Sequence, residues 1–363
     1  MASSSDPVAR RRAAAHHLRT QAQWCHHLGS PLYGALLERA AADCELGGAA
    51  WSILEPQADE PLAAAVALRL MGAVHRLVLE GAAPSLARHY PSAGGAVGNI
   101  EEAWQAFRTT LADHAVALRD LARAPVQTNE VGRSAVLFGG FLEIARNRSL
   151  PLRLLEIGAA AGLNLRWDRY RYEAGDAGWG DEHSAVRFAP TFDGQHPALD
   201  VRVAVAERHG CDPHPLDPSS EADRTTLRAY LWPDQIARRQ RLDAALEIAR
   251  SLPVRIEAMG AGDWLGMALA ASHDGVATVV FHSITMQYIA AGERARIREI
   301  LHDAGSRTTA TAPLAWLRFE PRKSEAGDLV YRLDLTQWPG ADTRTLALSS
   351  PHGPPVRWLA TTG

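Results

Sequence analysis

Residues 152–165 constrain the fold of this chain most strongly, because an apolar run there ends in an acid and a turn of small residues. The run, residues 152–157, is typical of a central parallel strand that is covered on both faces. Gly158 and Gly162 lack a Cβ, so they permit a tight turn and let the main chain approach a ligand closely. The helix that we expect next offers unpaired N–H groups at its start. The stretch therefore predicts a strand, a turn and a helix at a cofactor site.

The spacing of small residues in this turn disfavours a dinucleotide as the cofactor. A dinucleotide site needs G-x-G-x-x-G, whereas the turn reads E-x-G-x-A-x-G. This pattern resembles the first motif of class I S-adenosylmethionine-dependent methyltransferases, E/D-x-G-x-G-x-G, with Ala160 in place of the middle glycine. The resemblance implies that S-adenosyl-L-methionine is the cofactor and that Glu156, Gly158, Ala160, Gly162 and Asn164 bind it. Ala160 departs from the motif, and its methyl group can be accommodated only if the backbone there stays at negative φ. The alternative is an ordinary strand-to-helix turn without a ligand.

The charge balance and the cysteines exclude several classes of protein. The 363 residues carry 38 Lys and Arg against 41 Asp and Glu, a formal net charge of −3, with no long basic run. Nucleic acid is therefore not expected as a partner. The three cysteines show no C-x-x-C spacing, and no uninterrupted apolar stretch approaches membrane-spanning length. We expect a cytoplasmic protein without disulfides, a metal site or a membrane partner.

The 363 residues exceed the usual length of one domain, so we expect the chain to form two parts. Apolar residues recur at helical spacing from the N-terminus to about residue 125, and proline and glycine residues separate the periodic segments. We therefore expect residues 1–125 to form a helical layer that covers the carboxyl edge of a sheet as a lid. Residues 126–363 are expected to form a Rossmann-like methyltransferase domain, with an insertion at about 171–200 that is rich in glycine, aspartate and aromatic residues.

A polar turn precedes the first strand. Residues 127–133 open the helix before it and hold polar groups of both signs beside an apolar helix. Such a turn suits ligand recognition, so Asn129, Glu130 and Arg133 are candidate substrate-binding residues. In the alternative interpretation, Thr128 or Asn129 simply caps the helix.

The second strand is expected to end in a residue that binds the ribose. Residues 201–207 alternate apolar and small side chains and end in Glu207. In a nucleotide-binding sheet, a carboxylate at this point accepts hydrogen bonds from the ribose hydroxyls. The alternative is a surface glutamate that pairs with Arg208.

The third strand leads to a candidate adenine site. Residues 253–258 form this strand, and Gly262, Asp263 and Trp264 follow it. Asp263 can accept a hydrogen bond from the adenine amino group while the indole of Trp264 stacks on the ring. In the alternative, Asp263 is the N-cap of an ordinary helix.

The fourth strand ends in two candidate catalytic residues. Residues 277–281 are apolar, and His282 and Ser283 follow at the carboxyl end, where active sites of α/β proteins lie. His282 can act as the base for an acceptor that must lose a proton, and Ser283 can orient the ring or the acceptor. The alternative is a structural histidine whose ring bonds a neighbouring carbonyl.

The order of the remaining segments predicts the sheet. Residues 313–320 read as a fifth strand, and residues 329–333 and 345–348 read as a closing antiparallel pair. Alternation of helices and strands followed by two strands without a helix is the succession of the class I methyltransferase sheet. We expect a seven-stranded, mostly parallel Rossmann-like sheet of the α/β class.

Several motifs across the chain resemble a bacterial family of unknown function that is grouped with these methyltransferases. The motifs are residues 127–130, Leu163-Asn164-Leu165 with Asp168 and Tyr170, residues 232–235, His282-Ser283 with Gln287 and Tyr288, and residues 315–318. The resemblance implies substrate-binding roles for Asp168, Tyr170, Gln287 and Tyr288. The expected function is S-adenosylmethionine-dependent methyl transfer to a small-molecule acceptor. The alternative is a non-catalytic regulatory or scaffold protein that binds S-adenosylmethionine or S-adenosylhomocysteine, and the glycine spacing disfavours a nicotinamide-dependent oxidoreductase.

Overall fold

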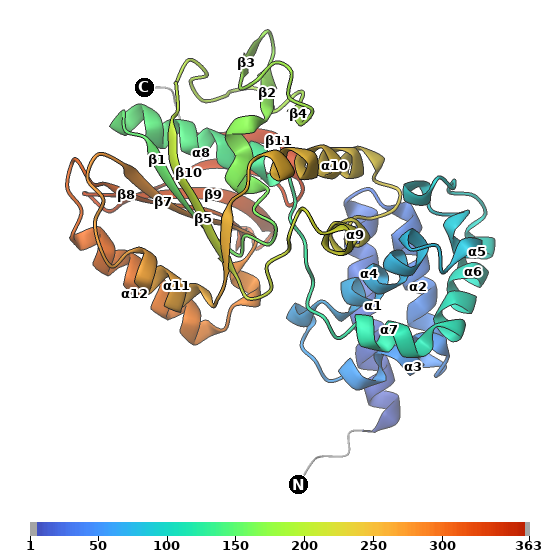
Figure 1. Cartoon of the computed structure of the whole chain (residues 1–363). Helices are drawn as coiled ribbons and strands as arrows, with labels where there is room; N and C mark the ends of the chain where they lie inside the picture. The colour runs from blue at the N-terminus through green and yellow to red at the C-terminus, as the bar shows by residue number, and fades with distance from the viewer. Residues whose placement is uncertain (1–5, 360–363) are drawn as a thin grey trace. The chain divides into compact units, whose positions relative to one another are not determined.

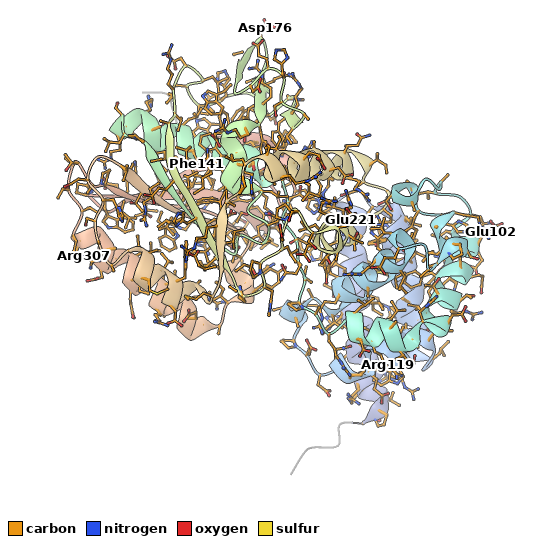
Figure 2. The ribbon with its side chains drawn as sticks, in the orientation of Figure 1. Glu102, Arg119, Phe141, Asp176, Glu221 and Arg307 are labelled. Atoms are coloured by element: carbon orange, nitrogen blue, oxygen red, sulfur yellow. The ribbon has the colours of Figure 1, made fainter. Side chains whose placement is uncertain are left out.

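The computed structural model describes residues 6–359, and its contacts divide the chain into two compact units (Figure 1). One unit comprises Met1–Thr128 and Glu221–Gln240, and the other comprises Asn129–Ser220 and Arg241–Gly363. A buried apolar cluster lies within each unit. Figure 2 shows the side chains of both units.

The first unit is helical, and prolines begin several of its helices, where a missing N–H costs no hydrogen bond. Its α-helices are α1 (Pro7–His27), α2 (Pro31–Glu45), α3 (Ala49–Leu54), α4 (Val66–Leu79), α5 (Pro84–Ala87), α6 (Ile100–Asp113), α7 (Ala115–Leu121) and α9 (Glu221–Ala229). Short 3₁₀ turns are η1 (Glu55–Gln57), η2 (Leu62–Ala64) and η3 (Pro91–Ala93). Helix α10 (Ile236–Ser251) begins in this unit and ends in the other.

Most residues of α4 are buried in the helical unit. By length and composition alone, Leu62–Leu79 is apolar enough to cross a membrane, but 61% of this window is buried inside the protein. Such burial is typical of the core helix of a soluble globular protein.

Helix α9 packs against α4, although the sequence pattern predicts it as part of the domain at 126–363. The Nδ1 atom of His75 on α4 donates to the carbonyl oxygen of Ala229 (3.1 Å), and its Nε2 atom lies 2.7 Å from Oγ of Ser92. Burial lowers the pKa of His75 to about 4, so the ring is neutral and can accept from the Ser92 hydroxyl. The buried imidazole therefore ties the returning segment to the helical unit.

The second unit is built on an eight-stranded mixed sheet with the order β11-β10-β9-β8-β7-β1-β5-β6. Its strands are β1 (Leu152–Ile157), β5 (Val205–Asp212), β6 (Arg255–Ala258), β7 (Ala277–Ser283), β8 (Leu314–Lys323), β9 (Leu329–Trp338), β10 (Asp342–Ser350) and β11 (Gly353–Trp358). Strands β6, β5, β1, β7 and β8 are parallel, whereas the neighbours from β8 to β11 are antiparallel. A separate sheet within the segment 171–200 has the order β3-β2-β4, formed by β2 (Arg171–Ala174), β3 (Ala177–Trp179) and β4 (Arg187–Phe188).

The prediction of a seven-stranded, mostly parallel Rossmann-like sheet is wrong. Strands β8 to β11 run antiparallel because the connections between them are short turns, whereas parallel neighbours need a crossover of a dozen or more residues. The eighth strand, β11, contains Pro354 and Pro355, which argue against a strand in the sequence. It lies at the edge of the sheet, where proline is tolerated.

Helices cover both faces of the large sheet (Figure 1). Helix α8 (Arg133–Arg148) packs on one face against β7 to β11, and α11 (Ala261–Ala268) and α12 (Ala291–Ser306) lie on the other. The turns η4 (Asn164–Arg169) and η5 (Met286–Tyr288) lie beyond the carboxyl ends of β1 and β7. Cover on both faces explains why every residue of β1 and β7 is buried.

We expect Asp234→Ala to destabilise the helical unit by about 1–3 kcal/mol. The Asp234 carboxylate accepts hydrogen bonds from the Ser30 hydroxyl (2.6 Å) and from the Leu32 N–H (3.2 Å) at the start of α2, so its loss leaves a helix-end N–H unpaired. Urea unfolding measures the change. The control is Asp59→Ala, which removes an exposed carboxylate paired with Arg10 and should cost less than about 1 kcal/mol. Equal losses would contradict this role of Asp234.

Candidate functional site

Every second residue of the loop after β1, from 158 to 162, adopts the left-handed region of backbone conformation. Gly158, Ala160 and Gly162 have φ values of 68°, 50° and 67°. The condition of a negative φ at Ala160 is therefore not met, and an alanine in this region costs about 1–2 kcal/mol. The loop leads into the 3₁₀ turn η4 and not into the predicted α-helix. Strain of this kind is held only where the surrounding structure fixes the loop.

Hydrogen bonds to the end of β5 fix this loop. The N–H groups of Gly158 and Ala159 donate to the carbonyl oxygen of Cys211 (2.9 and 3.0 Å), and the Ala160 N–H donates to Oδ2 of Asp212 (3.0 Å). The parallel register of the strands, which pairs Ile157 with Cys211, brings these groups together. These three N–H groups are thus already engaged and do not form a cradle for a phosphate.

The acid at the carboxyl end of the second parallel strand is Asp212, not Glu207. The sequence pattern predicts a strand at 201–207, but β5 occupies Val205–Asp212. Glu207 lies opposite Arg153 near the amino end of β1 and forms an ion pair with it (2.9 Å). Asp212 is buried beside the loop, and its Oδ1 atom also accepts from the His214 N–H (2.9 Å). Asp212 therefore replaces Glu207 as the candidate for the ribose.

Glu156 is a buried acid with an unpaired oxygen at the end of the central strand. Its side chain is 1% exposed, and Oε2 has no hydrogen-bond partner among the described residues. Burial raises the pKa of Glu156 well above its ordinary value, although a hydrogen bond from Asn164 and the charge of Arg166 oppose this shift. A buried carboxyl with an orphan oxygen is an uncommon and costly arrangement. The site therefore suits a ligand that brings a cation or a hydrogen-bond donor.

Polar residues around Glu156 come from the turn before α8 and from the loop itself. Oδ1 of Asn129 accepts from the Leu163 N–H (2.8 Å), and Oδ1 of Asn164 accepts from the Ser134 hydroxyl (2.6 Å). Arg133 donates through Nη1 to the carbonyl oxygen of Ser283 at the end of β7 (2.9 Å). The structure thus brings the candidates Asn129, Arg133, Asn164 and Ser283 to one edge of the sheet.

The adjacent candidate Glu130 has a local role. Its Oε1 atom accepts from the N–H of Gly132 (3.0 Å), so this carboxylate stabilises the turn that begins α8. The side chain is buried.

Arg166 supports the loop and is not marked by any motif in the sequence. Its guanidinium is buried and donates to the carbonyl oxygens of Ala161 (3.1 Å) and Gly162 (2.7 Å). It also donates to Leu252 (2.8 Å) and Ala249 (3.3 Å) from the segment before β6. Burial lowers its pKa to about 10, which still leaves it charged at neutral pH. Only the fold reveals this role, because the arginine bonds main-chain atoms from distant segments.

The residues predicted to bind adenine follow the carboxyl end of β6 at the start of α11, and they have partners within the fold. The indole of Trp264 is buried in the apolar cluster beneath α12 and donates to Oε2 of Glu257 (3.0 Å). Asp263 is exposed and pairs with Arg296 (2.7 Å). The Gly262 N–H donates to Glu293 (2.7 Å). The Trp264 ring packs in the core because α11 begins immediately after β6 and turns its apolar side to the sheet.

Two further substrate candidates have partners within the fold. Asp168 accepts from Arg208 (2.7 Å), and burial raises its pKa above the ordinary value. The hydroxyl of Tyr170 donates to the carbonyl oxygen of Leu163 (2.7 Å) and so supports the loop. The remaining two candidates, Gln287 and Tyr288, are exposed on η5.

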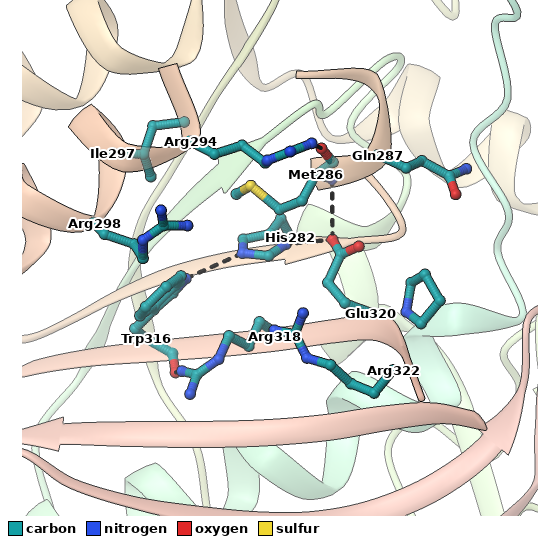
Figure 3. Close-up of a pocket in the computed structure, with 11 residues that line it drawn as sticks. His282, Met286, Gln287, Arg294, Ile297, Arg298, Trp316, Arg318, Glu320 and Arg322 are labelled. Atoms are coloured by element: carbon teal, nitrogen blue, oxygen red, sulfur yellow. Dashed lines mark hydrogen bonds and ion pairs between the residues drawn. The ribbon is translucent and has the colours of Figure 1, made fainter. Parts of the chain in front are cut away.

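Both ring nitrogens of His282 are hydrogen-bonded (Figure 3). Nδ1 lies 2.7 Å from Oε1 of Glu320, and Nε2 lies 3.1 Å from Nε1 of Trp316. An indole N–H can only donate, so Nε2 is the acceptor and the ring proton lies on Nδ1. The same Glu320 oxygen accepts from the N–H groups of Thr285 (2.9 Å) and Met286 (3.3 Å). A base role for His282 would therefore require the bond to Trp316 to break.

The surroundings of Glu320 favour the charged form of its carboxylate. Burial alone would raise its pKa, but the hydrogen bond from His282 and those from two main-chain N–H groups outweigh burial and hold the pKa below its ordinary value. The charged carboxylate thus fixes the segment after β7. Thr285 in this segment lies against the loop, because a Cβ added to Gly158 would lie 2.5 Å from Cγ2 of Thr285.

Comparison with protein families finds one that matches most of the chain. Residues 15–358 match the family described as uncharacterized protein conserved in bacteria (DUF2332). The chain belongs to this family. The resemblance to an uncharacterised bacterial family is thereby confirmed, and the DUF2332 match spans most of both units. No curated protein and no solved structure matches the chain. Within residues 6–359, no three His, Cys, Asp or Glu side chains gather as a metal site would require.

We expect opposite behaviour from two substitutions in the loop. Gly158→Ala should destabilise the protein by about 1–3 kcal/mol, because its φ is positive and the new Cβ meets Thr285. Ala160→Gly should leave stability within about 1 kcal/mol of wild type, because relief at positive φ offsets the greater chain entropy of glycine. Thermal and urea unfolding compare the two. A larger loss in Ala160→Gly than in Gly158→Ala would contradict this loop conformation.

Proposed function

We propose that this protein binds S-adenosyl-L-methionine beside Glu156 and transfers its methyl group to a small-molecule acceptor. The observation that carries the proposal is the unpaired Oε2 atom of the buried Glu156 at the end of the central strand. The ammonium or a hydroxyl of the cofactor would supply the missing donor. The resemblance of E-x-G-x-A-x-G to the first methyltransferase motif supports the same choice.

The charges at the loop favour this cofactor over a dinucleotide. Glu156 and Asp212 both lie beside the loop, and Asp212 is one of the charges that act on Glu156. Asp212 and the ionised form of Glu156 attract a ligand with a sulfonium and an ammonium group, whereas they repel a pyrophosphate. A dinucleotide would also need free loop N–H groups, and those of Gly158, Ala159 and Ala160 are bonded to β5.

The order of the parallel strands supports a ligand at this edge. In β6-β5-β1-β7-β8, the chain runs outward from β1 to β6 on one side and from β7 to β8 on the other. Ligands of open α/β sheets bind at the carboxyl ends of the strands where the order reverses, here between β1 and β7. The proposal needs only this parallel portion of the sheet, and the antiparallel strands β9 to β11 lie on its far side.

In the proposed mechanism, some residues at the loop edge bind the cofactor and others hold the loop in place. Glu156 and the loop main chain would hold the methionine part, and Asp212 would accept from the ribose hydroxyls. When bound, the cofactor supplies a methyl group activated by the sulfonium. Arg166 keeps the loop in place, and the pair of His282 and Glu320 keeps Thr285 against it. We propose a positioning role for His282, so that the rate gain comes mainly from orientation of the acceptor.

A non-catalytic binding protein is the second candidate. The observation in its favour is that both nitrogens of His282 are already bonded, which leaves no free imidazole at the end of β7. The formation of S-adenosylhomocysteine in the presence of a bacterial small-metabolite extract separates the two candidates. Steady production above the rate without extract supports an enzyme, whereas binding without production supports a regulatory protein.

We expect Glu156→Gln to weaken binding of S-adenosylmethionine by roughly 10- to 100-fold, because a charged hydrogen bond is lost at a buried position. Isothermal titration calorimetry of the full-length protein measures this. The matched control is Glu207→Gln, which makes the same change in the ion pair with Arg153 near the amino end of β5 and should leave the affinity unchanged. Absence of binding by the wild type, or equal affinities in both variants, would overturn the cofactor proposal.

The same substitution should also change how stability depends on pH. The pKa of Glu156 is raised in the folded state, so the folded protein holds this proton more tightly than the unfolded chain. This contribution is fully present below the ordinary pKa of 4.5 and is lost as the pH rises through the higher folded value. Urea unfolding at pH 4.5 and pH 8 should therefore show a smaller loss of stability in Glu156→Gln than in wild type. Identical losses of stability in the two proteins would contradict a raised pKa of Glu156.

A further inference from the structure

A cavity of about 360 Å³ lies beside β8 in the second unit (Figure 3). Its walls come from β7, η5, α12 and β8. The volume falls within the range of sites that hold small molecules. Part of the lining is apolar, from Met286, Ile297 and Trp316.

Four arginines converge on this cavity, two from α12 and two from β8 (Figure 3). They are Arg294, Arg298, Arg318 and Arg322. The pair on β8 share one face because side chains alternate along a strand, and the pair on α12 share one face because they are four residues apart. No carboxylate lies within 4 Å of any of these four guanidinium groups in the part of the chain that the structure describes. Glu320, the one acid among the described residues that line the cavity, is bonded to His282 and to main-chain N–H groups.

Another arginine of α12 does have carboxylate partners. Arg296 on α12 lies outside the cavity and pairs with both Asp263 (2.7 Å) and Glu293 (3.7 Å). Among the described residues, one acid of α11 and one of α12 therefore pair with the exposed Arg296, whereas neither arginine of α12 that lines the cavity has such a partner. Uncompensated positive charge in a concave site attracts a ligand of opposite charge.

Two of the four arginines are held rigidly. Arg318 is buried, stacks on the Trp316 ring at 4.3 Å and donates through Nη1 to the Thr336 hydroxyl (2.8 Å). Burial lowers its pKa to about 10, with Arg322 contributing in the same direction and Asp334 opposing it. Arg294 donates through Nη1 to the carbonyl oxygens of Met286 (3.1 Å) and Ile289 (3.0 Å).

The other two arginines form the outer part of the cavity. Arg298 and Arg322 are exposed, and neither makes a hydrogen bond to any described residue. Two fixed guanidinium groups and two unengaged ones together can surround an anion with paired N–H donors, which is the geometry that carboxylates and phosphates accept.

We propose that this cavity binds a small organic dianion, either a phosphate monoester or a dicarboxylate, with its charged group between the arginines and its apolar part against Met286, Ile297 and Trp316. This site is separate from the loop at Gly158, and the proposal does not rest on the proposed cofactor.

Calorimetric titration of the full-length protein with phenyl phosphate and with succinate at low ionic strength tests the proposal. We expect at least one probe to bind, and Arg298→Gln or Arg322→Gln to weaken it by roughly 10- to 100-fold, because each removes a charged donor. Tighter binding of phenyl phosphate identifies a phosphate site, and tighter binding of succinate identifies a dicarboxylate site. Unfolding curves of both variants should match wild type, since neither side chain contacts the fold through a hydrogen bond.

The control is Arg296→Gln, which removes one positive charge from the same helix outside the cavity. It should change the affinity by less than roughly twofold. If neither probe binds the wild type, the cavity is not an anion site. If Arg296→Gln weakens binding as much as the cavity variants do, the attraction is a property of the whole surface, and the proposal fails.

Discussion

The parallel pairing of β1 with β5 is the constraint on which the candidate site depends. It pairs Ile157 with Cys211, so the loop that leaves β1 meets the end of its neighbour. Three loop N–H groups bond to Cys211 and Asp212, and these bonds hold Ala160 at a positive φ that an alanine adopts only at a cost. A slip of one residue would turn Glu156 to the opposite face of the sheet and separate the loop from Asp212.

Part of this arrangement can be predicted from the sequence, because β1 and β7 are buried on both faces and appear as largely apolar runs. Strand β5 has no such signal. Its side chains Glu207, Arg208 and His209 are polar and partly exposed, so the alternating segment just before it is mistaken for the strand. The error displaces the acid at the strand end from Asp212 to Glu207. Arg166 and Glu320 are missed for another reason, since their partners are distant in the sequence.

The architecture departs from the predicted sheet where local signals conflict with tertiary structure. Two prolines in β11 argue against a strand, yet the sheet edge needs no donor there. Helix α9 follows β5 in the chain, as a crossover helix would, but His75 binds its last residue, Ala229, within the helical unit. Neither outcome has a signature in local periodicity, because each depends on which surface the segment meets.

The position of Glu320 has a consequence for the two proposed sites. One face of this carboxylate lines the arginine cavity, while its Oε1 atom holds the segment that places Thr285 against Gly158. If an anion in the cavity shifts Glu320, it also changes the hydrogen bonds from the N–H groups of Thr285 and Met286 to this carboxylate. The position of Thr285 against the loop then changes as well. Thermodynamic reciprocity then requires that ligands at the two places alter each other's affinity by the same factor. The carboxylate is thus a point at which the protein can make one binding event conditional on another.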